Sequence, residues 1–358
     1  MYLRLLVVAR LDELMGPYLA PLASHPSVGE VVVLRDAEGP AVPKARYRVP
    51  PKRFPGILHH AWTRTSEGIR MAHDRPFDAV VGFTYLPHGW VGDRIARRCG
   101  APLHVHLPGA DLMPECHGPM VRRWIVRRLN GCDTVSVTGS DHRARLLEAG
   151  FPEDRLFVLP KGIDAARFRP SGEARTYDVA FVGRLHPQKD PVGWLAAFAA
   201  LRARLPAVRG VMLGDGPLAG AAREARERLG LATCVEMPGF RAAAETFLRR
   251  SRILLGTSRY EGLPHTVVEA MACGTPYVGY APGSVRDAVR DGEDGILVEP
   301  SDPARLVEAA ASLLSAPGRL SAMAGRAARV VERHHPEAAR GVWGAVFARL
   351  GLAGSAAP

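Results

Sequence analysis

The chain has 358 residues, of which 47% are hydrophobic and 23% charged, and its 47 basic and 36 acidic residues give a formal net charge of +11. This composition is globular and excludes a mostly disordered chain, while the length suits two domains of roughly 100–200 residues. No segment reaches the ~18–20 consecutive apolar residues of a membrane-spanning helix, and the first ten residues lack a signal-peptide cleavage region. We therefore expect a cytoplasmic protein.

The basic excess leaves two interpretations open. It fits a partner such as nucleic acid, an anionic membrane surface or a phosphorylated substrate, and it equally fits an Arg-rich sequence without such a partner. The five cysteines form no Cys-x-x-Cys pair and predict reduced thiols, not disulfides or a zinc site; they stand at positions 99, 116, 132, 234 and 273.

Short apolar segments alternate with amphipathic ones along the whole chain. In the first half we expect strands at residues 3–9, 30–34, 78–83, 102–106, 133–137 and 156–159, and helices at 89–98 and 120–129. In the second half we expect strands at 178–182, 210–213, 234–237, 253–256, 277–280 and 296–298, and helices at 191–204, 218–229 and 242–249. This alternation predicts an α/β fold of two doubly wound parallel-sheet domains facing a cleft. Ligands of such sheets bind at the carboxyl ends of the strands.

Pro170, Ser171 and Gly172 interrupt the pattern within residues 165–176. We therefore expect a first domain at 1–165, a second domain at 166–335 and a tail at 336–358. Within the tail, residues 337–350 predict a helix with one apolar stripe, made of Val342, Trp343, Val346 and Phe347.

The most informative segment is 258–276, which follows the strand expected at 253–256. Pro264 suits the first turn of a helix and Gly274 the residue after its end. Free amides and the positive dipole end make such a helix N-terminus an anion site. Glu261 precedes this helix and Glu269 lies within it, so both carboxylates can face one ligand.

The segment resembles the retaining glycosyltransferases of family four, which have the GT-B fold and carry a Glu–seven residues–Glu element. The resemblance implies an N-terminal acceptor-binding domain at 1–165, a C-terminal nucleotide-sugar-binding domain at 166–335, and a tail helix that crosses back onto the first domain. It implies that Glu269 holds the ribose hydroxyls of a nucleotide and that Glu261 contacts the hydroxyls of the donor sugar. It also implies that the backbone between them binds the diphosphate, through Gly262, Leu263, Pro264, His265 and Thr266.

Residues 181–190 resemble the family's Val-Gly-Arg-Leu…Lys-Gly element, with Asp190 in place of its last glycine. Here the resemblance implies that Gly183 meets the donor and that Arg184 and Lys189 neutralise the departing diphosphate, whose extra charge needs fixed cations. The Gly-Asp-Gly-Pro turn at 214–217 has a structural role in this comparison, and the nucleobase meets the chain near Phe240 and Arg241.

The first half matches the family less closely. A loop with Asp12 and Glu13 replaces the family's Gly-Gly loop, and residues 104–111 match its His-Gly-x-Asp element only at Gly109 and Asp111. His106 is the nearest histidine and our candidate beside the reacting centre; the alternative is a hydrogen-bonded core histidine. Asp12, Glu13 and Asp111 together predict an acidic acceptor pocket for an amine-bearing acceptor.

We accordingly expect a retaining enzyme that moves a hexose or N-acetylhexosamine from a nucleotide diphosphate sugar, with a UDP-sugar favoured, to a hydroxyl of a small acceptor. An aminocyclitol or amino sugar of natural-product biosynthesis fits the acidic pocket. The alternatives are a lipid-linked or cell-envelope acceptor, a GT-B nucleotide-sugar epimerase and a non-catalytic sugar-nucleotide sensor. We expect no cofactor and no metal, because Arg184, Lys189 and the helix N-terminus supply positive charge. We also expect no nucleic-acid partner, since a recognition motif is missing.

One basic segment has no place in this scheme. Residues 122–128 contain four arginines and Trp124 on an expected helix. Such a face can touch anionic lipid, but the shortness of the segment favours a solvated surface.

Overall fold

A computed structural model describes residues 2–9, 16–39, 41–50, 57–112, 117–300 and 302–352, apart from the side chains of 57–60 and 110. The chain divides into two compact units, residues 1–162 with 335–358, and residues 163–334. These boundaries lie within three residues of the expected domain limits. Asp12 and Glu13 fall outside the described residues.

The first unit is built on a seven-stranded sheet in the order β3-β2-β1-β4-β5-β6-β7, and all of its strand pairs are parallel. Its strands are β1 (Leu3–Val8), β2 (Val28–Leu34), β3 (Ala45–Arg48), β4 (Ala79–Phe83), β5 (Leu103–Leu107), β6 (Thr134–Val137) and β7 (Leu156–Val158). Its helices are α1 (Gly16–Ala23), α2 (Ile57–Asp74), α3 (Trp90–Cys99), α4 (Pro119–Leu129), α5 (Ser140–Glu148) and α14 (Pro336–Arg349). Short helical turns lie at Tyr85–Gly89, Ala110–Leu112 and Glu153–Arg155.

The second unit has a six-stranded sheet in the order β10-β9-β8-β11-β12-β13, again with parallel pairs throughout. The strands are β8 (Tyr177–Val182), β9 (Gly210–Leu213), β10 (Val235–Gly239), β11 (Ser251–Gly256), β12 (Tyr277–Tyr280) and β13 (Gly295–Val298). The helices are α6 (Pro191–Arg204), α7 (Ala219–Arg228), α8 (Ala244–Arg249), α9 (His265–Ala272), α10 (Val285–Ala288), α11 (Pro303–Leu314), α12 (Pro317–Ala327) and α13 (Val330–Arg333). Two Rossmann-like units confirm the predicted fold class.

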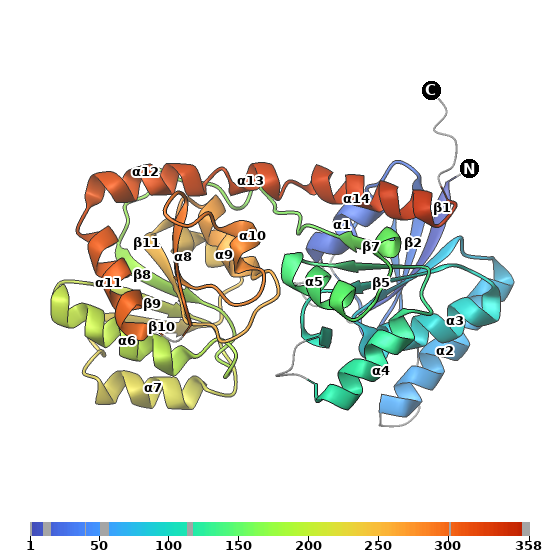
Figure 1. Ribbon diagram of the computed structural model, residues 1–358, viewed down its shortest axis with the longest axis horizontal. Coiled ribbons are helices and arrows are strands. Elements are labelled where there is room, and N and C mark those ends of the chain that lie inside the picture. Colours follow the sequence, from blue (N-terminus) through green and yellow to red (C-terminus); the bar gives the residue numbers. More distant parts are fainter. Residues whose placement is uncertain are drawn as a thin grey trace. The chain divides into compact units, whose positions relative to one another are not determined.

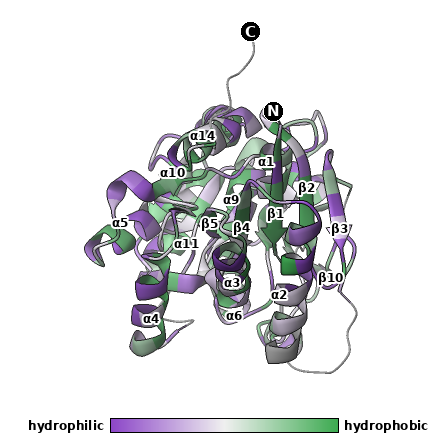
Figure 2. Cartoon of the chain, turned by 90° about the vertical axis from the view of Figure 1, so that its right-hand side faces the viewer, coloured by the Kyte–Doolittle hydropathy of each residue, from purple (hydrophilic) through white to green (hydrophobic). Residues whose placement is uncertain are grey.

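Each sheet buries both of its faces, as continuous apolar strands predict. In the first unit one apolar cluster includes Val80, Val105 and Ile125, and a second includes Leu5, Val81 and Trp343. The green colour of β1 and β4 against the mixed colours of α2 and α4 shows this layering in Figure 2. The second unit likewise has two clusters, one against α6 and α11 and one against α9.

The C-terminal helix belongs to the first unit, as the family resemblance implies. Trp343, Val346 and Phe347 are almost fully buried in the cluster that α1 also joins. Figure 1 shows α14 beside α1 and β7. The chain therefore leaves the first unit after Gly162 and returns to it at His335.

The described part of the chain contains no helix that is long and apolar enough to cross a bilayer. Cys99, Cys132, Cys234 and Cys273 are free thiols, and Cys116 lies outside the described residues.

Candidate active site

In the second unit the strand order reverses between β8 and β11, which are hydrogen-bonded neighbours. In a doubly wound sheet this switch point opens a crevice at the carboxyl ends of the strands. The loop after β8 holds residues 183–190, and the loop after β11 holds residues 257–264. Most of the donor-site residues expected from the sequence therefore flank one crevice.

Several hydrogen bonds join these two loops. The Thr257 hydroxyl donates to the backbone oxygens of Lys189 and Asp190, at 3.0 and 3.1 Å. The Arg259 amide donates to the Gln188 carbonyl at 2.8 Å, and the Gln188 side-chain amide donates to the Tyr260 carbonyl at 3.0 Å. Because the bonds run in both directions, the loops form one structure at the switch point.

The central charged contact is an ion pair between Lys189 Nζ and Glu261 Oε1. Both side chains are largely buried, with 18% of Lys189 and 6% of Glu261 exposed. The side-chain amide of Gln188 also donates a hydrogen bond to the other carboxylate oxygen, with Nε2 3.4 Å from Glu261 Oε2. Glu261 thus has a fixed orientation, and Lys189 is a cation positioned beside it.

A small cavity opens next to this pair. Lys189 and Glu261 line it together with Thr257, Ser258, Pro264 and Thr266. Tyr277 also lines the cavity. Its hydroxyl donates a hydrogen bond to the Tyr280 carbonyl at 2.6 Å. Burial, and to a lesser extent the negative charge of Glu261, raises the pKa of this hydroxyl. The cavity therefore combines a cation, a carboxylate and four hydroxyl side chains at the start of α9.

α9 begins at His265, with Pro264 as the residue that precedes its first turn. The sequence predicted that Pro264 would lie in the first turn of this helix, whereas it immediately precedes the helix. The first turn of α9, with His265 and Thr266, directs its amides and its positive dipole end toward this part of the crevice. Gly274 has a φ of +71°, as expected for the residue that ends a helix.

Glycines hold the loops in place. A Cβ on Gly214, whose φ is +141°, would lie 1.9 Å from the carbonyl oxygen of Gly183. A Cβ on Gly283 would lie 2.0 Å from the carbonyl oxygen of Glu261. Only glycine permits such close backbone contacts, so the turns at 214–217 and 282–284 pack directly against the loops that carry Gly183 and Glu261.

The remaining donor-site candidates differ in exposure. Glu269 is half-buried on α9, whereas Arg184, Phe240 and Arg241 are exposed, with 60% of Phe240 accessible. The Arg184 side chain has no hydrogen-bond or ion-pair partner among the described residues. It is therefore available to an anionic ligand.

Two residues of this site were not predicted as site residues from the sequence. Gln188 and Thr257 orient the charged pair through contacts with residues about 70 positions away, and neither contact leaves a local pattern. Gln188 could only have been found from its place between Gly183 and Lys189.

His106, in the first unit, is fully buried at the end of β5. Its Nδ1 lies 2.9 Å from the Ser136 hydroxyl, which also lies 2.8 Å from His104 Nε2. Burial, with His104 and His142 nearby, holds the pKa of His106 well below its usual value. This environment favours the alternative of a neutral core histidine, and a role beside the reacting centre stays a prediction.

Asp111 is also buried. Its Oδ1 accepts a hydrogen bond from the Tyr85 amide at 2.7 Å, and burial raises the pKa of its carboxyl to about 6. Asp111 therefore positions the turn after β4 and presents no accessible charge. Since Asp12 and Glu13 are outside the described residues, the expected acidic acceptor pocket has no support from the described structure.

No cluster of three or more His, Cys, Asp or Glu side chains suited to a metal ion occurs in the described ranges. The expectation of a metal-free site stays a prediction.

Comparisons with known proteins agree with this geometry. Residues 164–331 match the family model "Glycosyl transferases group 1", and residues 20–162 match "Glycosyl transferase 4-like domain". A GDP-mannose-dependent alpha-(1-6)-phosphatidylinositol monomannoside mannosyltransferase of Mycolicibacterium smegmatis is 32% identical over 249 residues, 64% of each chain. A D-inositol 3-phosphate glycosyltransferase of Segniliparus rotundus is 36% identical over 189 residues, 48% of this chain and 42% of the relative. The matches thus span between about two fifths and two thirds of these relatives.

Two solved structures share the fold across nearly the whole chain. Anabaena HepE, solved with UDP and glucose, has a TM-score of 0.84 at 21% identity, with 97% of this chain and 100% of that chain covered. The sucrose-phosphate synthase of Thermosynechococcus elongatus has a TM-score of 0.80 at 19% identity, with 98% and 100% covered.

Proposed function

Because the chain belongs to the group 1 glycosyltransferases of the GT-B fold, GT4-type, we propose that it transfers a hexose unit from a nucleotide diphosphate sugar to an acceptor hydroxyl with retention of the anomeric configuration. The observation that carries the proposal is the Lys189–Glu261 pair at the β8–β11 switch point, beside the N-terminus of α9. A cation and a helix dipole there suit a diphosphate, and a fixed carboxylate suits sugar hydroxyls.

The donor would lie along the carboxyl ends of β8, β10 and β11. Glu269 on α9 would hold the ribose hydroxyls, and the exposed Phe240 and Arg241, directly after β10, would meet the base. Arg184, Lys189 and the first turn of α9 would balance the diphosphate, whose charge grows as it departs. Such interactions act in the transition state and raise kcat.

For the reaction itself we propose a front-side path. The bond between the anomeric carbon and the diphosphate oxygen breaks, and the acceptor oxygen forms its bond on the same face. The acceptor proton passes to the departing phosphate oxygen. Such a path needs no enzyme nucleophile, and Glu261, engaged by Lys189 and Gln188, would position the sugar.

Two donors and two acceptor classes are candidates. The sequence favours a UDP-sugar, whereas the name of the mycolicibacterial relative points to GDP-mannose. The names of both relatives point to acceptors that contain inositol phosphate. Asp111 is buried, and Asp12 and Glu13 lie outside the described residues, so the amine-bearing acceptor stays a prediction. The names of the relatives make a phosphate-bearing or lipid-linked acceptor our first candidate.

The test is an incubation of the purified protein with UDP- and GDP-hexoses against inositol phosphates, phosphoinositides, aminocyclitols and neutral polyols. Mass spectrometry identifies the product, and the proton coupling at its anomeric carbon gives the configuration. We expect an α-linked product from an α-linked donor. Epimerised donor without acceptor would instead establish an epimerase, and an inverted product would contradict the front-side path.

A further inference from the structure

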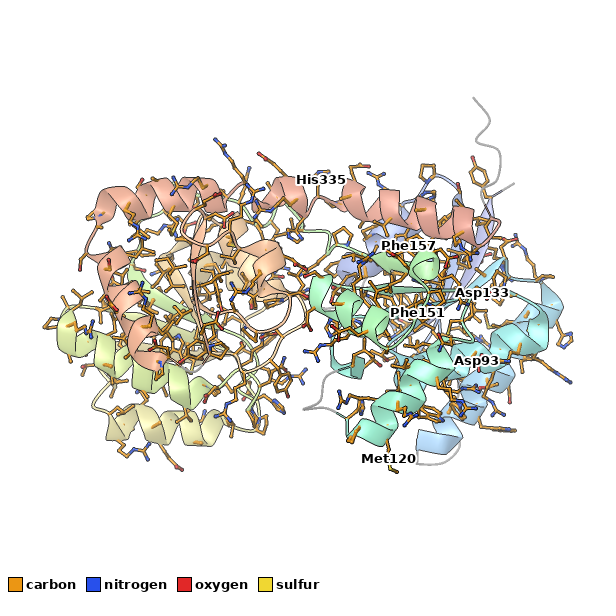
Figure 3. The ribbon with its side chains drawn as sticks, in the orientation of Figure 1. Asp93, Met120, Asp133, Phe151, Phe157 and His335 are labelled. Carbon is orange, nitrogen blue, oxygen red and sulfur yellow. The ribbon has the colours of Figure 1, made fainter. Side chains whose placement is uncertain are left out.

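The helix α4 of the first unit presents two parallel rows of side chains to solvent. Met120 and Trp124 form an apolar row, and Arg123 and Arg127 form a cationic row beside it; both pairs are four residues apart and so share the outer face of the helix. Met120 is 83% exposed and Trp124 41%, whereas Ile125 and Leu129 on the opposite face are buried. Figure 3 shows Met120 at the outer end of α4. We name these four residues the α4 face.

The charge at the α4 face is not neutralised within the unit. The side chains of Arg122, Arg123 and Arg127 have no ion-pair or hydrogen-bond partner among the described residues. By contrast, the neighbouring Arg128 pairs with Asp93 at 2.6 Å and Arg145 with Asp141 at 2.8 Å. Arg123 and Arg127 are exposed, whereas Arg122 is half-buried with its Nε buried. The unpaired cations on the outer face of α4 are therefore Arg123 and Arg127.

A groove of about 620 Å³ runs beside this face, between α4 and α5. Its described lining residues include one acidic side chain, Glu148, and four arginines, namely Arg122, Arg123, Arg127 and Arg145. A concave wall with one sign of charge concentrates the field and attracts anions. The groove thus extends the cationic row into a site large enough for phosphate groups.

We propose that the α4 face docks the protein on an anionic phospholipid surface. Met120 and Trp124 enter the boundary between headgroups and acyl chains, where the amphipathic indole ring is favoured, and the arginines contact lipid phosphates along the groove. Nucleic acid matches the charge but offers no apolar layer to an exposed methionine. A solvated helix, the expectation from the sequence, accounts for part of Trp124, whose ring packs against buried Tyr85 with centroids 5.7 Å apart, but it gives no role to Met120, which is 83% exposed.

Vesicle flotation tests this docking without any sugar substrate, so the result is independent of the proposed reaction. The protein should float with vesicles of phosphatidylcholine and phosphatidylglycerol, should not float with phosphatidylcholine alone, and should dissociate as salt screens the charges. Equal binding to both vesicle types, or binding to duplex DNA with none to anionic vesicles, would overturn the proposal.

A charge-matched pair of variants locates the surface. Arg122→Gln, Arg123→Gln and Arg127→Gln together should lower the partition onto anionic vesicles by about a hundredfold, since each arginine near such a surface contributes about fivefold. The control removes three charges from exposed positions on α6 and α7, with Arg204→Gln, Arg223→Gln and Arg228→Gln. Equal losses in both variants would attribute binding to the total charge of +11 and overturn the role of α4.

A second readout reports insertion of the apolar row. Vesicles with brominated acyl chains should quench part of the tryptophan fluorescence, and Trp124→Phe should abolish that quenching. Trp62→Phe, which removes an indole 61% exposed on α2, should leave it intact. Quenching that survives Trp124→Phe would show that another surface enters the lipid. Circular dichroism of every variant checks that these exposed substitutions leave the fold intact.

Discussion

At the scale of single residues, Lys189 and Glu261 depend on each other. Replacing Lys189 by Met leaves the Glu261 carboxylate buried without its cation, which costs roughly 3–5 kcal/mol for a buried pair. We expect Lys189→Met to lower the free energy of unfolding by this order and kcat by about 10²–10³-fold, the effect of removing one electrostatic stabiliser. Urea unfolding and steady-state kinetics measure the two effects separately.

The double variant separates structure from chemistry. Adding Glu261→Gln to Lys189→Met removes the unpaired charge, so stability should return while turnover stays low. Arg259→Met is the control for an ordinary pair, because Arg259 is 66% exposed and its bond to Asp190 contributes at most about 1 kcal/mol. Recovery of turnover along with stability would mean that Lys189 acts only through the fold.

Asp111 predicts a pH dependence of stability with a definite sign. Its pKa is raised to about 6 in the fold, so between about pH 4 and 6 the folded protein binds a proton that the unfolded chain has lost. The free energy of unfolding should therefore fall as pH rises through this window, by about 3 kcal/mol from this group. Asp111→Asn should remove the fall: its stability advantage over the native protein is large at pH 7 and disappears near pH 4. An advantage that does not change with pH in urea melts would contradict the assignment.

At the scale of elements, the turn after β9 supports the loop that carries Arg184 and Lys189. A Cβ on Gly214 would overlap the Gly183 carbonyl, and the φ of Gly214 is one that other residues rarely adopt. Gly214→Ala should displace residues 183–189 and reduce turnover by at least tenfold.

Gly220→Ala is the matched control, because Gly220 lies in α7 with no atom within 4 Å of an added Cβ. Alanine there should stabilise the helix by up to about 1 kcal/mol and leave kcat unchanged. Unchanged kinetics in Gly214→Ala would show that the loop does not need this support.

The sequence predicts elements well where burial is continuous. All twelve expected strands are present, because parallel strands buried on both faces read as uninterrupted apolar runs. The seven-residue spacing between Glu261 and Glu269 likewise predicts where the donor binds, at the start of α9.

The missed features are those that local pattern does not encode. Strand β3 (Ala45–Arg48) was not expected, because an edge strand that pairs only with β2 alternates half-buried and exposed residues and contains two arginines. The pairing of Lys189 with Glu261 joins residues 72 positions apart, and the burial of Asp111 depends on a turn from another strand. Such contacts follow from the order of the strands in each sheet, because that order determines which loops lie next to each other.

At the scale of the whole molecule, each unit has its own sheet and its own pair of apolar clusters. The first unit is nevertheless not one continuous segment of the sequence, because α14 (Pro336–Arg349) belongs to it. His104 and Trp343 illustrate this connection: their rings lie 5.0 Å apart although 239 residues separate them. The fold of the first unit therefore depends on residues far from the rest of it along the chain.

Deletion of residues 336–358 tests this dependence. The segment's three large, almost fully buried side chains, Trp343, Val346 and Phe347, each contribute roughly 1.5–3 kcal/mol on burial, a sum comparable with the whole stability of a domain. Hydrogen exchange should show lost protection in β1, β4 and α1, while β8–β13 stay protected and the protein still binds a nucleoside diphosphate. Deletion of residues 353–358 alone, past the last described residue, is the control and should change neither unit. Protection lost across the second unit as well would mean that its fold also requires α14, whereas full protection in the first would mean that the helix is dispensable.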